Sequence, residues 1–395
     1  MSNGLLDNPN LIPGLPPTDY YAPNFKVLVE GRELDETTHG DILDLKVTME
    51  KDHLTSFELT VNNWDDKSFD FKYSDTTTFD IGNRVDIQMG YADRLRYMAR
   101  GVVTTLTPRF PESGVPTLGV TGVDSLVKLK EKKPKDGQQK IFKNMEDWKI
   151  AGEVARRNKL EFEPTKEGKP QELVNQGDQT EAIFLLERAK RNDFDCFIRV
   201  NPETGHDRLF FMKPTNIRDA RRSRIYVFEW GRNLMNFNPQ LTLNRQVASV
   251  EVRGWDPRTK EPITYKAQLS DLPDNGGGGT NGAKAADKKL DKPEHIVVNK
   301  KVLNVQEARD LAISMLRERA YKFLTGSGQV IGLPDLRPGD NLELKGLGQR
   351  FSGPADNPIQ YEITKVVHSL GNSGYLTQFS VRSATDGGTS KGQSQ

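Results

Sequence analysis

The chain has 395 residues, which exceeds the size at which one hydrophobic core keeps growing, so two or three domains are expected. Its 56 Lys plus Arg and 55 Asp plus Glu leave a formal charge of +1, which gives no overall electrostatic reason for binding nucleic acid or an anionic membrane. The single cysteine, Cys196, excludes an internal disulfide, and neither a signal-peptide pattern nor a run of about 18 apolar residues is present. These totals predict a protein that is made in the cytoplasm without a signal peptide and does not itself insert into a membrane.

Residues 1–24 are rich in Pro and Asn and lack a sustained period, so they are predicted to form an extended N-terminal arm. Alternating apolar residues begin at Phe25 and recur up to about residue 125, in segments separated by Gly, Pro or Asn-rich turns. The strand candidates are FKVLVEGREL, ILDLKVTME, SFELTVNNW, RVDIQMGY, RYMARGVVTTLTP and PTLGVTGV. Residues 25–128 are therefore predicted to form a first β-barrel domain.

Residues 129–224 have a different character and are predicted to form an α+β insert domain. They begin with KLKEKKPKDGQQK, a basic, Pro-containing stretch that we interpret as a linker. NMEDWKIAGEVARRNKL and QTEAIFLLERAKRN then place apolar residues at helical spacing, and DCFIRVNPETGHDRLFFMKP is typical of a hairpin.

The strand pattern returns at residue 225, and residues 225–384 are predicted to form a second β-barrel domain. A glycine-rich loop at 273–293 interrupts it; this loop lacks the GK[ST] ending of a phosphate-binding loop, so we interpret it as a flexible surface segment. A helix is predicted at 304–323, starting in a pattern that resembles a capping box. The Gly-, Ser- and Thr-rich residues 385–395 are predicted to be a disordered tail.

Three pairs of segments match in the same order and predict an internal duplication. VNNWDDKSFD matches VRGWDPRTKE at a shared Trp-Asp pair, IGNRVDIQMG matches RPGDNLELKG at a glycine turn, and VVTTL with SGVPT matches EITKV with SGYLT. We expect each Trp to close the end of a barrel core and each Asp to form a turn instead of acting as an acid catalyst. The structural repeat markers are Trp64, Asp65, Gly82, Trp255, Asp256 and Gly339.

Residue patterns for catalysis or metal binding are few. The five histidines are far apart and Cys196 has no CxxC neighbour, so we predict no metal site and no cofactor. The acidic pair Asp65-Asp66 is compatible with glycoside hydrolysis, but a turn is the preferred interpretation. The basic cluster Arg218 to Arg224 lacks interleaved aromatic residues, so we interpret it as a connector or a protein interface with no required nucleic acid. We therefore predict a protein that is not an enzyme.

Four strings together resemble the phage late control protein D family, the baseplate hub of contractile phage tails and injection systems: SFELTVNNWDDKSFDFKYSD, FDIGNRVDIQMGY, FPESGVPTLGVTGVDSL and LTLNRQVASVEVRGWDPRTK. The resemblance extends from about residue 24 to 384. Members of that family are similar in fold to the hub part of type VI valine-glycine repeat spike proteins. The resemblance implies a homotrimer in which each chain supplies two barrels of the tail-tube type.

A trimer of a twice-repeated domain could match a sixfold tube on one side and a threefold spike on the other. The expected function is therefore that of a structural symmetry adaptor, incorporated into a phage tail or injection particle. Its expected partners are the inner tube protein, a spike protein carried on a separate chain, and baseplate wedge proteins. The alternative is a tail-associated hydrolase that cuts the peptidoglycan of the cell wall.

Overall fold

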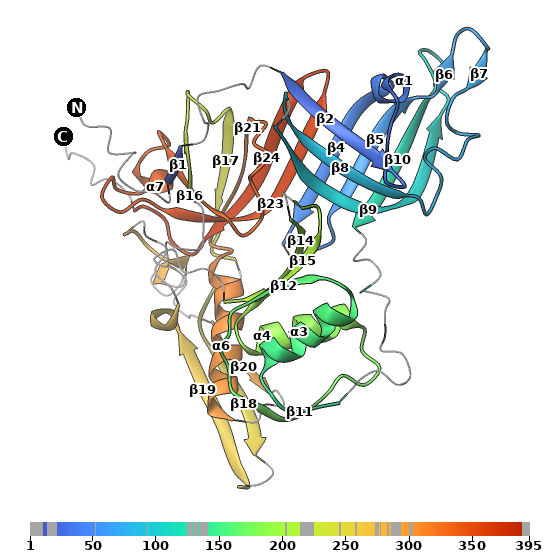
Figure 1. Ribbon diagram of the computed structural model, residues 1–395. Helices are drawn as coiled ribbons and strands as arrows, with labels where there is room; N and C mark the ends of the chain where they lie inside the picture. The colour runs from blue at the N-terminus through green and yellow to red at the C-terminus, as the bar shows by residue number, and fades with distance from the viewer. Residues whose placement is uncertain are drawn as a thin grey trace, which may run out of the picture.

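One sheet of 14 strands runs through most of the molecule (Figure 1). The other strands form smaller sheets that lie, with the long helices, beside it. The computed structural model describes residues 11–13, 22–51, 53–92, 94–124, 129, 133, 141–201, 204–213, 225–244, 246–256, 259–272, 276, 278–282, 284–285, 294–299, 302 and 304–388.

The first half of the large sheet has the strand order β4-β5-β10-β9-β8-β2-β3. Its apolar residues alternate with polar ones, and the inward set forms one core that includes Leu45, Phe57 and Val120. A short helix and a two-stranded hairpin extend from its edge. The elements are β2 (Pro23–Val29), β3 (Arg32–Glu33), α1 (Glu36–Gly40), β4 (Ile42–Glu50), β5 (Ser56–Asn62), β6 (Trp64–Asp65), β7 (Asp70–Phe71), β8 (Arg84–Tyr91), β9 (Arg94–Arg109) and β10 (Thr117–Asp124).

The second half repeats this plan around its own core, with the order β17-β21-β24-β23-β22-β16 in place of β4-β5-β10-β9-β8-β2. The two orders differ in pairing at the last step, because β2 pairs antiparallel to β8 whereas β16 pairs parallel to β22. The elements are β16 (Ile225–Glu229), β17 (Asn236–Leu241), β21 (Leu324–Ile331), β22 (Asn341–Lys345), α7 (Gln349–Ser352), β23 (Gln360–Gly371) and β24 (Gly374–Ser383), with β1 (Leu11–Pro13) parallel to β16.

The two halves share a strand. β23 pairs with β22 through Gln360–Glu362 and with β4 of the first half through Lys365–Gly371. The predicted mainly β fold with an α+β insert is confirmed, but the prediction of separate closed barrels needs correction. Among the described strands, the sheet runs from β3 at one edge to β1 at the other and does not close. Each half provides one strand, β4 or β23, that pairs with the other half instead of closing on its own.

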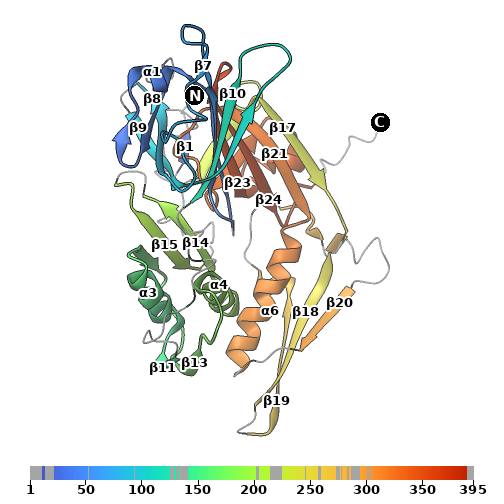
Figure 2. The same ribbon diagram turned by 90° about the vertical axis from the view of Figure 1, so that its right-hand side faces the viewer.

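The insert has its own core and covers one end of the first half (Figure 2). Its two helices have stripes of buried apolar residues, and Thr180 caps the second helix through the Ile183 N–H. The elements are β11 (Ile141–Met145), α3 (Asp147–Arg157), β12 (Glu161–Pro164), β13 (Gln171–Asn175), α4 (Glu181–Arg191), β14 (Asp195–Val200) and β15 (Asp207–Met212).

A second inserted unit lies between β17 and β21 in the chain, at the position between β4 and β5 of the first half. It is a three-stranded sheet packed against a long helix, with its own core that includes Val250, Val252 and Leu316. The β18–β19 hairpin extends well beyond the helix (Figure 2). The elements are β18 (Val247–Asp256), β19 (Glu261–Gln268), η1 (Leu269–Asp271), β20 (Glu294–Asn299) and α6 (Val305–Ala320).

The expectation that each Trp closes a barrel core is wrong. Trp255 is 57 % exposed at the end of β18, in the second inserted unit, and Trp64 lies half-buried in the β6–β7 hairpin. What the two segments share is a local turn: the Phe69 N–H donates to the Asp65 carbonyl and the Lys260 N–H donates to the Asp256 carbonyl, both at 2.9 Å. A Trp-Asp pair before a turn therefore marks the end of a hairpin strand and not an equivalent place in the two halves.

Gly82 and Gly339, by contrast, occupy the same turn in the two halves, before β8 and before β22. Both have a positive φ, 92° and 84°, which favours glycine. The Gly82 N–H donates to the Val103 carbonyl (2.8 Å) and the Gly339 N–H to the Ile363 carbonyl (2.7 Å). The same strand residues also donate in return: the Val103 N–H to the Asn83 carbonyl and the Ile363 N–H to the Asp340 carbonyl, both at 2.9 Å.

The halves also share a β-bulge. The β9–β10 ladder skips Thr104 and the β23–β24 ladder skips Thr364. Each threonine hydroxyl donates across the bulge, to the Thr121 carbonyl (3.3 Å) and to the Ser380 carbonyl (3.2 Å). Because Thr121 thereby corresponds to Ser380, the structure moves the SGVPT–SGYLT match by one residue.

Several sequence expectations lie wholly or largely outside the described residues: most of the arm 1–24, the linker, the cluster Arg218 to Arg224 and most of the loop 273–293. The start of the tail needs a correction, because residues 385–388 make specific contacts. Asp386 accepts from the Thr280 N–H at 2.8 Å, and the Gly387 N–H donates to the Arg350 carbonyl at 2.9 Å. Two described glycines of the loop also contact the start of the tail: the Gly276 carbonyl accepts from the Thr385 hydroxyl at 2.9 Å, and the Gly279 N–H donates to the Asp386 carbonyl at 3.1 Å.

Candidate functional site

A buried ion network lies where the first half, the second half and the insert meet. Lys51, just after β4, donates to Asp195 of β14 at 2.9 Å and also to Glu362 of β23. Arg382 of β24 donates to Glu362 at 2.8 Å, and Arg317 of α6 lies 3.7 Å from Asp195. One cluster therefore ties together the first half, the second half, the insert and α6 of the second inserted unit.

The charges in this network support each other. Burial disfavours the charged amine, but the carboxylates of Asp195 and Glu362 outweigh it, so the pKa of Lys51 is raised. Burial likewise disfavours the ionised carboxyl, but Lys51 and Arg382 hold the pKa of Glu362 below its ordinary value. Near neutral pH Lys51 and Glu362 are therefore both charged, and removal of one of them leaves its partners buried with less compensation.

Arg337 forms a second contact between the halves, in which no described carboxylate pairs with its guanidinium. Its guanidinium donates to the Tyr97 carbonyl of β9 at 3.2 Å and to the Met98 sulfur at 3.3 Å. It also lies 3.4 Å from His368 Nε2. Burial, together with the Arg337 charge, holds the pKa of His368 well below its ordinary value, so the imidazole is neutral. Its Nε2 faces the Leu336 carbonyl at 3.2 Å and donates to it, while Nδ1 can accept from the Tyr375 hydroxyl at 3.1 Å.

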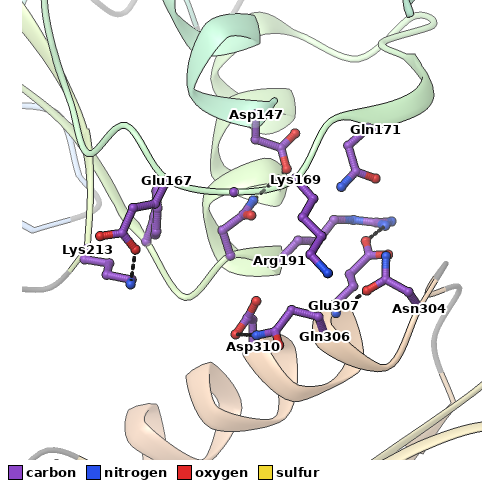
Figure 3. A pocket seen from close by; sticks show the side chains of 13 residues that line it. Asp147, Glu167, Lys169, Gln171, Arg191, Lys213, Asn304, Gln306, Glu307 and Asp310 are labelled. Atoms are coloured by element: carbon purple, nitrogen blue, oxygen red, sulfur yellow. Dashed lines mark hydrogen bonds and ion pairs between the residues drawn. The ribbon is translucent and has the colours of Figure 1, made fainter. Parts of the chain in front are cut away.

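A polar cleft of about 300 Å³ separates the insert from the N-terminal end of α6 (Figure 3). Arg191 of α4 spans it to Glu307 of α6 at 2.6 Å, and Gln306 donates to Asp310 at 2.8 Å. On the insert side, Lys213 forms an ion pair with Glu167. Figure 3 shows Arg191 and Glu307 directed toward each other, whereas Lys213 and Glu167 pair on the insert side and Gln306 and Asp310 on α6. The Arg191–Glu307 pair is therefore a charged contact between α6 and the insert.

Acidic and basic side chains line the cleft, but few of the described ones are arranged for catalysis. Burial raises the pKa of Asp310, while the Gln306 amide opposes that shift. Asp147 is engaged by Arg188 at 2.6 Å and by Asn192 at 2.7 Å. Within the described ranges, no group of three or more His, Cys, Asp or Glu is placed to hold a metal ion.

The acidic pair of the hydrolase alternative belongs to a turn. The Lys67 N–H donates to Asp65 at 2.9 Å and the Ser68 hydroxyl at 2.8 Å. These bonds, led by the one from the Lys67 N–H, lower the pKa of Asp65. A carboxyl with a lowered pKa is ionised near neutral pH and is a poor general acid.

Sequence reasoning found neither the ion network nor Arg337. The partners of Lys51 are 144 and 311 residues away in the chain, a separation that no local pattern reports. One signal was available: Lys51 and Glu362 are charged residues at the end or start of strands whose neighbours alternate cleanly.

In the described part of the chain, no helix is long and apolar enough to cross a membrane.

Solved structures similar to this chain include tail proteins and a secretion-system component. The 43 kDa tail protein of prophage MuSo2 from Shewanella oneidensis matches with a TM-score of 0.66 and 14 % identity, over 91 % of this chain and 98 % of that one. A tail protein from Neisseria meningitidis MC58 matches with a TM-score of 0.63 and 12 % identity, over 92 % and 97 %. The E. coli c3393 protein, a type VI secretion component, matches with a TM-score of 0.53 and 12 % identity, over 90 % and 76 %. The chain therefore has the fold of these tail and type VI proteins, and the predicted resemblance is confirmed at the level of the fold.

The family model described as the Alg8 N-terminal domain matches residues 20–371, and the chain belongs to that family. Its description names a domain and no activity, so the family by itself assigns no reaction. No curated protein sequence matches the chain.

Proposed function

We propose that the chain is a structural hub in the baseplate of a contractile tail or injection system. The observation that carries the proposal is the repeat: two halves with the same strand order, bulge and glycine turn are joined side by side through β23 and β4. A homotrimer of such a chain presents the repeated unit at a multiplicity that suits a sixfold tube, while its own threefold axis suits a spike.

The fold of the tail and type VI proteins supports this proposal. In the proposed particle, one face of the ring seats the inner tube protein and the other face seats a spike carried on a separate chain. Baseplate wedge proteins surround the ring. The chain performs no reaction in this function and requires no cofactor and no nucleic acid.

Two measurements test the proposal. The solution mass of the purified chain, 44.5 kDa as a monomer, is expected to be that of a trimer, either alone or after mixing with the tube or spike protein. Electron micrographs of assembled particles with a tagged chain are expected to show the tag between tube and tip. A chain that stays monomeric at high concentration with both partners, and is missing from the particles, would refute the hub.

A further inference from the structure

The cleft between the insert and α6 contains more charged groups than its own ion pairs join. Three cations line it, Lys169, Arg191 and Lys213. Arg191 donates to Glu307 at 2.6 Å, and Lys213 pairs with Glu167. One of the three cations therefore has no described acid that neutralises it.

That cation is Lys169, on the segment between β12 and β13 of the insert. Its side chain extends from this segment toward α6 (Figure 3), and it forms no hydrogen bond and no ion pair with a described residue. Gln171 follows two positions later, at the start of β13, and its side-chain amide likewise has no hydrogen-bond partner among the described residues. The insert wall of the cleft thus presents an ammonium and an amide to solvent.

On the α6 wall, Asp310 is the acid without an ion pair. Its carboxylate accepts from the Gln306 amide at 2.8 Å, but no described cation lies within ion-pair distance. Burial raises the pKa of Asp310, and the Gln306 hydrogen bond opposes that shift without reversing it. The charges of Arg309 and Lys213 act in the same direction as this hydrogen bond, also without reversing the shift. A cation placed against this carboxyl would therefore stabilise its ionised form.

The other acids of the cleft already have partners. Asp147 accepts from Arg188 at 2.6 Å and from Asn192 at 2.7 Å. Glu167 and Glu307 belong to the two pairs described above. The described side chains thus leave one positive group on the insert and one negative group on α6, on opposite walls of a space of about 300 Å³. A volume of this size lies at the lower end of the range that small ligands occupy in proteins.

We propose that the cleft binds a short peptide with a free N-terminal ammonium and a free C-terminal carboxylate. The peptide carboxylate accepts from the Lys169 ammonium and the Gln171 amide, and the peptide ammonium donates to the Asp310 carboxylate. Phe194 is the one apolar side chain of the described lining, so charge and hydrogen bonds select the ligand more than hydrophobic burial does.

A ligand with a single charge does not satisfy both walls. An anion would neutralise Lys169 but leave Asp310 without a cation, and a cation would do the reverse. A zwitterionic peptide neutralises both groups and bridges the insert and the second inserted unit, which have separate cores. The inference goes beyond the hub function, because a single copy of the chain contains the whole site.

Titration calorimetry of the full chain with synthetic alanine peptides tests the ligand class. The probes are di-, tri- and tetra-alanine with free ends. Because an extended chain spans about 3.3–3.6 Å per residue, this series samples the span from Lys169 to Asp310. The controls are the same peptides with an acetylated N-terminus or an amidated C-terminus. At least one free peptide is expected to bind, and each blocked form of it to bind at least about tenfold more weakly, because it lacks a charge-assisted hydrogen bond.

Two substitutions assign the ends of the peptide. Lys169→Gln is expected to abolish the preference for a free over an amidated C-terminus and to keep the preference for a free N-terminus. Asp310→Asn is expected to do the opposite. The matched controls are Lys166→Gln, on the same insert segment, and Glu318→Gln, on the same helix, since both residues lie outside the lining of the cleft. Both controls are expected to bind the peptides like wild type.

Hydrogen exchange locates the bound peptide. The backbone amides of residues 166–171 and 304–310 are expected to exchange more slowly in its presence, because the peptide contacts both walls. Slower exchange on one wall alone, or elsewhere in the chain, overturns the bridging site.

The titrations can also overturn the inference. Absence of binding by all three free peptides at millimolar concentration does so, and so does equal binding of free and blocked peptides to wild type. Equal selectivity of wild type and both cleft variants, with unchanged melting temperatures, overturns the assigned residues. None of these results bears on the hub, which is tested by the solution mass and by the position of the chain in the particle.

Discussion

The two halves of the sheet fill the same space with side chains from different strands. In the first half, Phe57 of β5 fills the core, and Gly122 of β10 makes room for it: a Cβ on Gly122 would lie 2.1 Å from the ring. In the second half, Gly326 of β21 stands at the position of Phe57, and Phe237 of β17 fills the space, 2.4 Å from a Cβ on Gly326. Strand order and register are thus kept while volume moves between neighbouring strands.

The halves differ more sharply in charge. Val102 and Val123 face each other across β9 and β10, whereas the corresponding positions of the second half are Glu362 and Arg382. Glu362 binds both Arg382 and Lys51. The ion network is therefore no part of the repeated plan. It occurs where the second half meets both the first half and the insert.

The largest effect is expected from breaking this network. Glu362→Ala should lower the free energy of unfolding by about 3 kcal/mol, because Lys51 and Arg382 remain buried without their shared carboxylate. Chemical denaturation measures this loss. The control is the quadruple variant Lys51→Met, Asp195→Asn, Glu362→Val, Arg382→Val, which removes both carboxylate partners together with Lys51 and should stay within about 1.5 kcal/mol of wild type. Equal losses in both would contradict the distinction between the halves.

The next largest effect is expected where the two halves fill the same core space with a phenylalanine from different strands. Gly326→Ala should cost about 1–3 kcal/mol, because the new methyl group overlaps the Phe237 ring. Adding Phe237→Leu should recover most of the loss, as judged by the denaturation midpoint. Gly40→Ala, at a position with no atoms within 4 Å of the added Cβ, is the control and should leave the midpoint unchanged.

A buried acid on β8 of the first half and on its counterpart β22 of the second half gives a smaller, pH-dependent effect. Asp86 accepts from Arg100 at 2.9 Å, whereas its counterpart Glu343 accepts from the neutral Gln360 amide at 3.3 Å and forms no ion pair with a described residue. Burial raises the pKa of Glu343 above its unfolded value, so its contribution to stability is present at low pH and is lost as pH rises through the folded pKa.

Gln360→Arg should remove this loss. Its melting temperature is expected to rise relative to wild type as pH increases from about 4 to 7, by the equivalent of about 1 kcal/mol at most. Gln360→Leu, which supplies no charge, should show no such rise. Parallel curves for wild type and Gln360→Arg would show that Glu343 does not limit stability.

The smallest effects are expected at the two Trp residues. Trp255→Ala should change the free energy of unfolding by less than about 0.5 kcal/mol, because the side chain is 57 % exposed. Trp64→Ala should cost about 1 kcal/mol through its edge contact with Phe71, whose ring centroid is 5.6 Å away. A loss above about 3 kcal/mol in either variant, measured by thermal melts, would restore the barrel-core interpretation.

The pattern of alternating residues predicted the mainly β class and the α+β insert, because each strand carries its own inward and outward faces. The glycine turns at Gly82 and Gly339 match in the structure, since a positive φ restricts the residue type locally. The Trp-Asp match misled because hairpin ends recur independently of the larger plan. The alignment therefore assigned β18 to the position that β21 holds.

The assembly of the parts could not be predicted from sequence. The pairing of Lys365 with Glu50 and the contacts of Arg337 join residues more than two hundred positions apart. The second inserted unit was also missed, because its strands alternate like those of the large sheet. Periodicity reports which face of a strand is buried and not which sheet contains it.

The sharing of β23 has a mechanical consequence. A force that pulls the two halves in opposite directions along their strands has to shear the whole Lys365–Gly371 ladder at once. The hydrogen bonds of the ladder lie perpendicular to that force and share the load. The same strand makes the halves melt together, since loss of β23 strips a neighbour from each. The two halves thus resist tension as one unit, whereas the two inserted units have cores of their own.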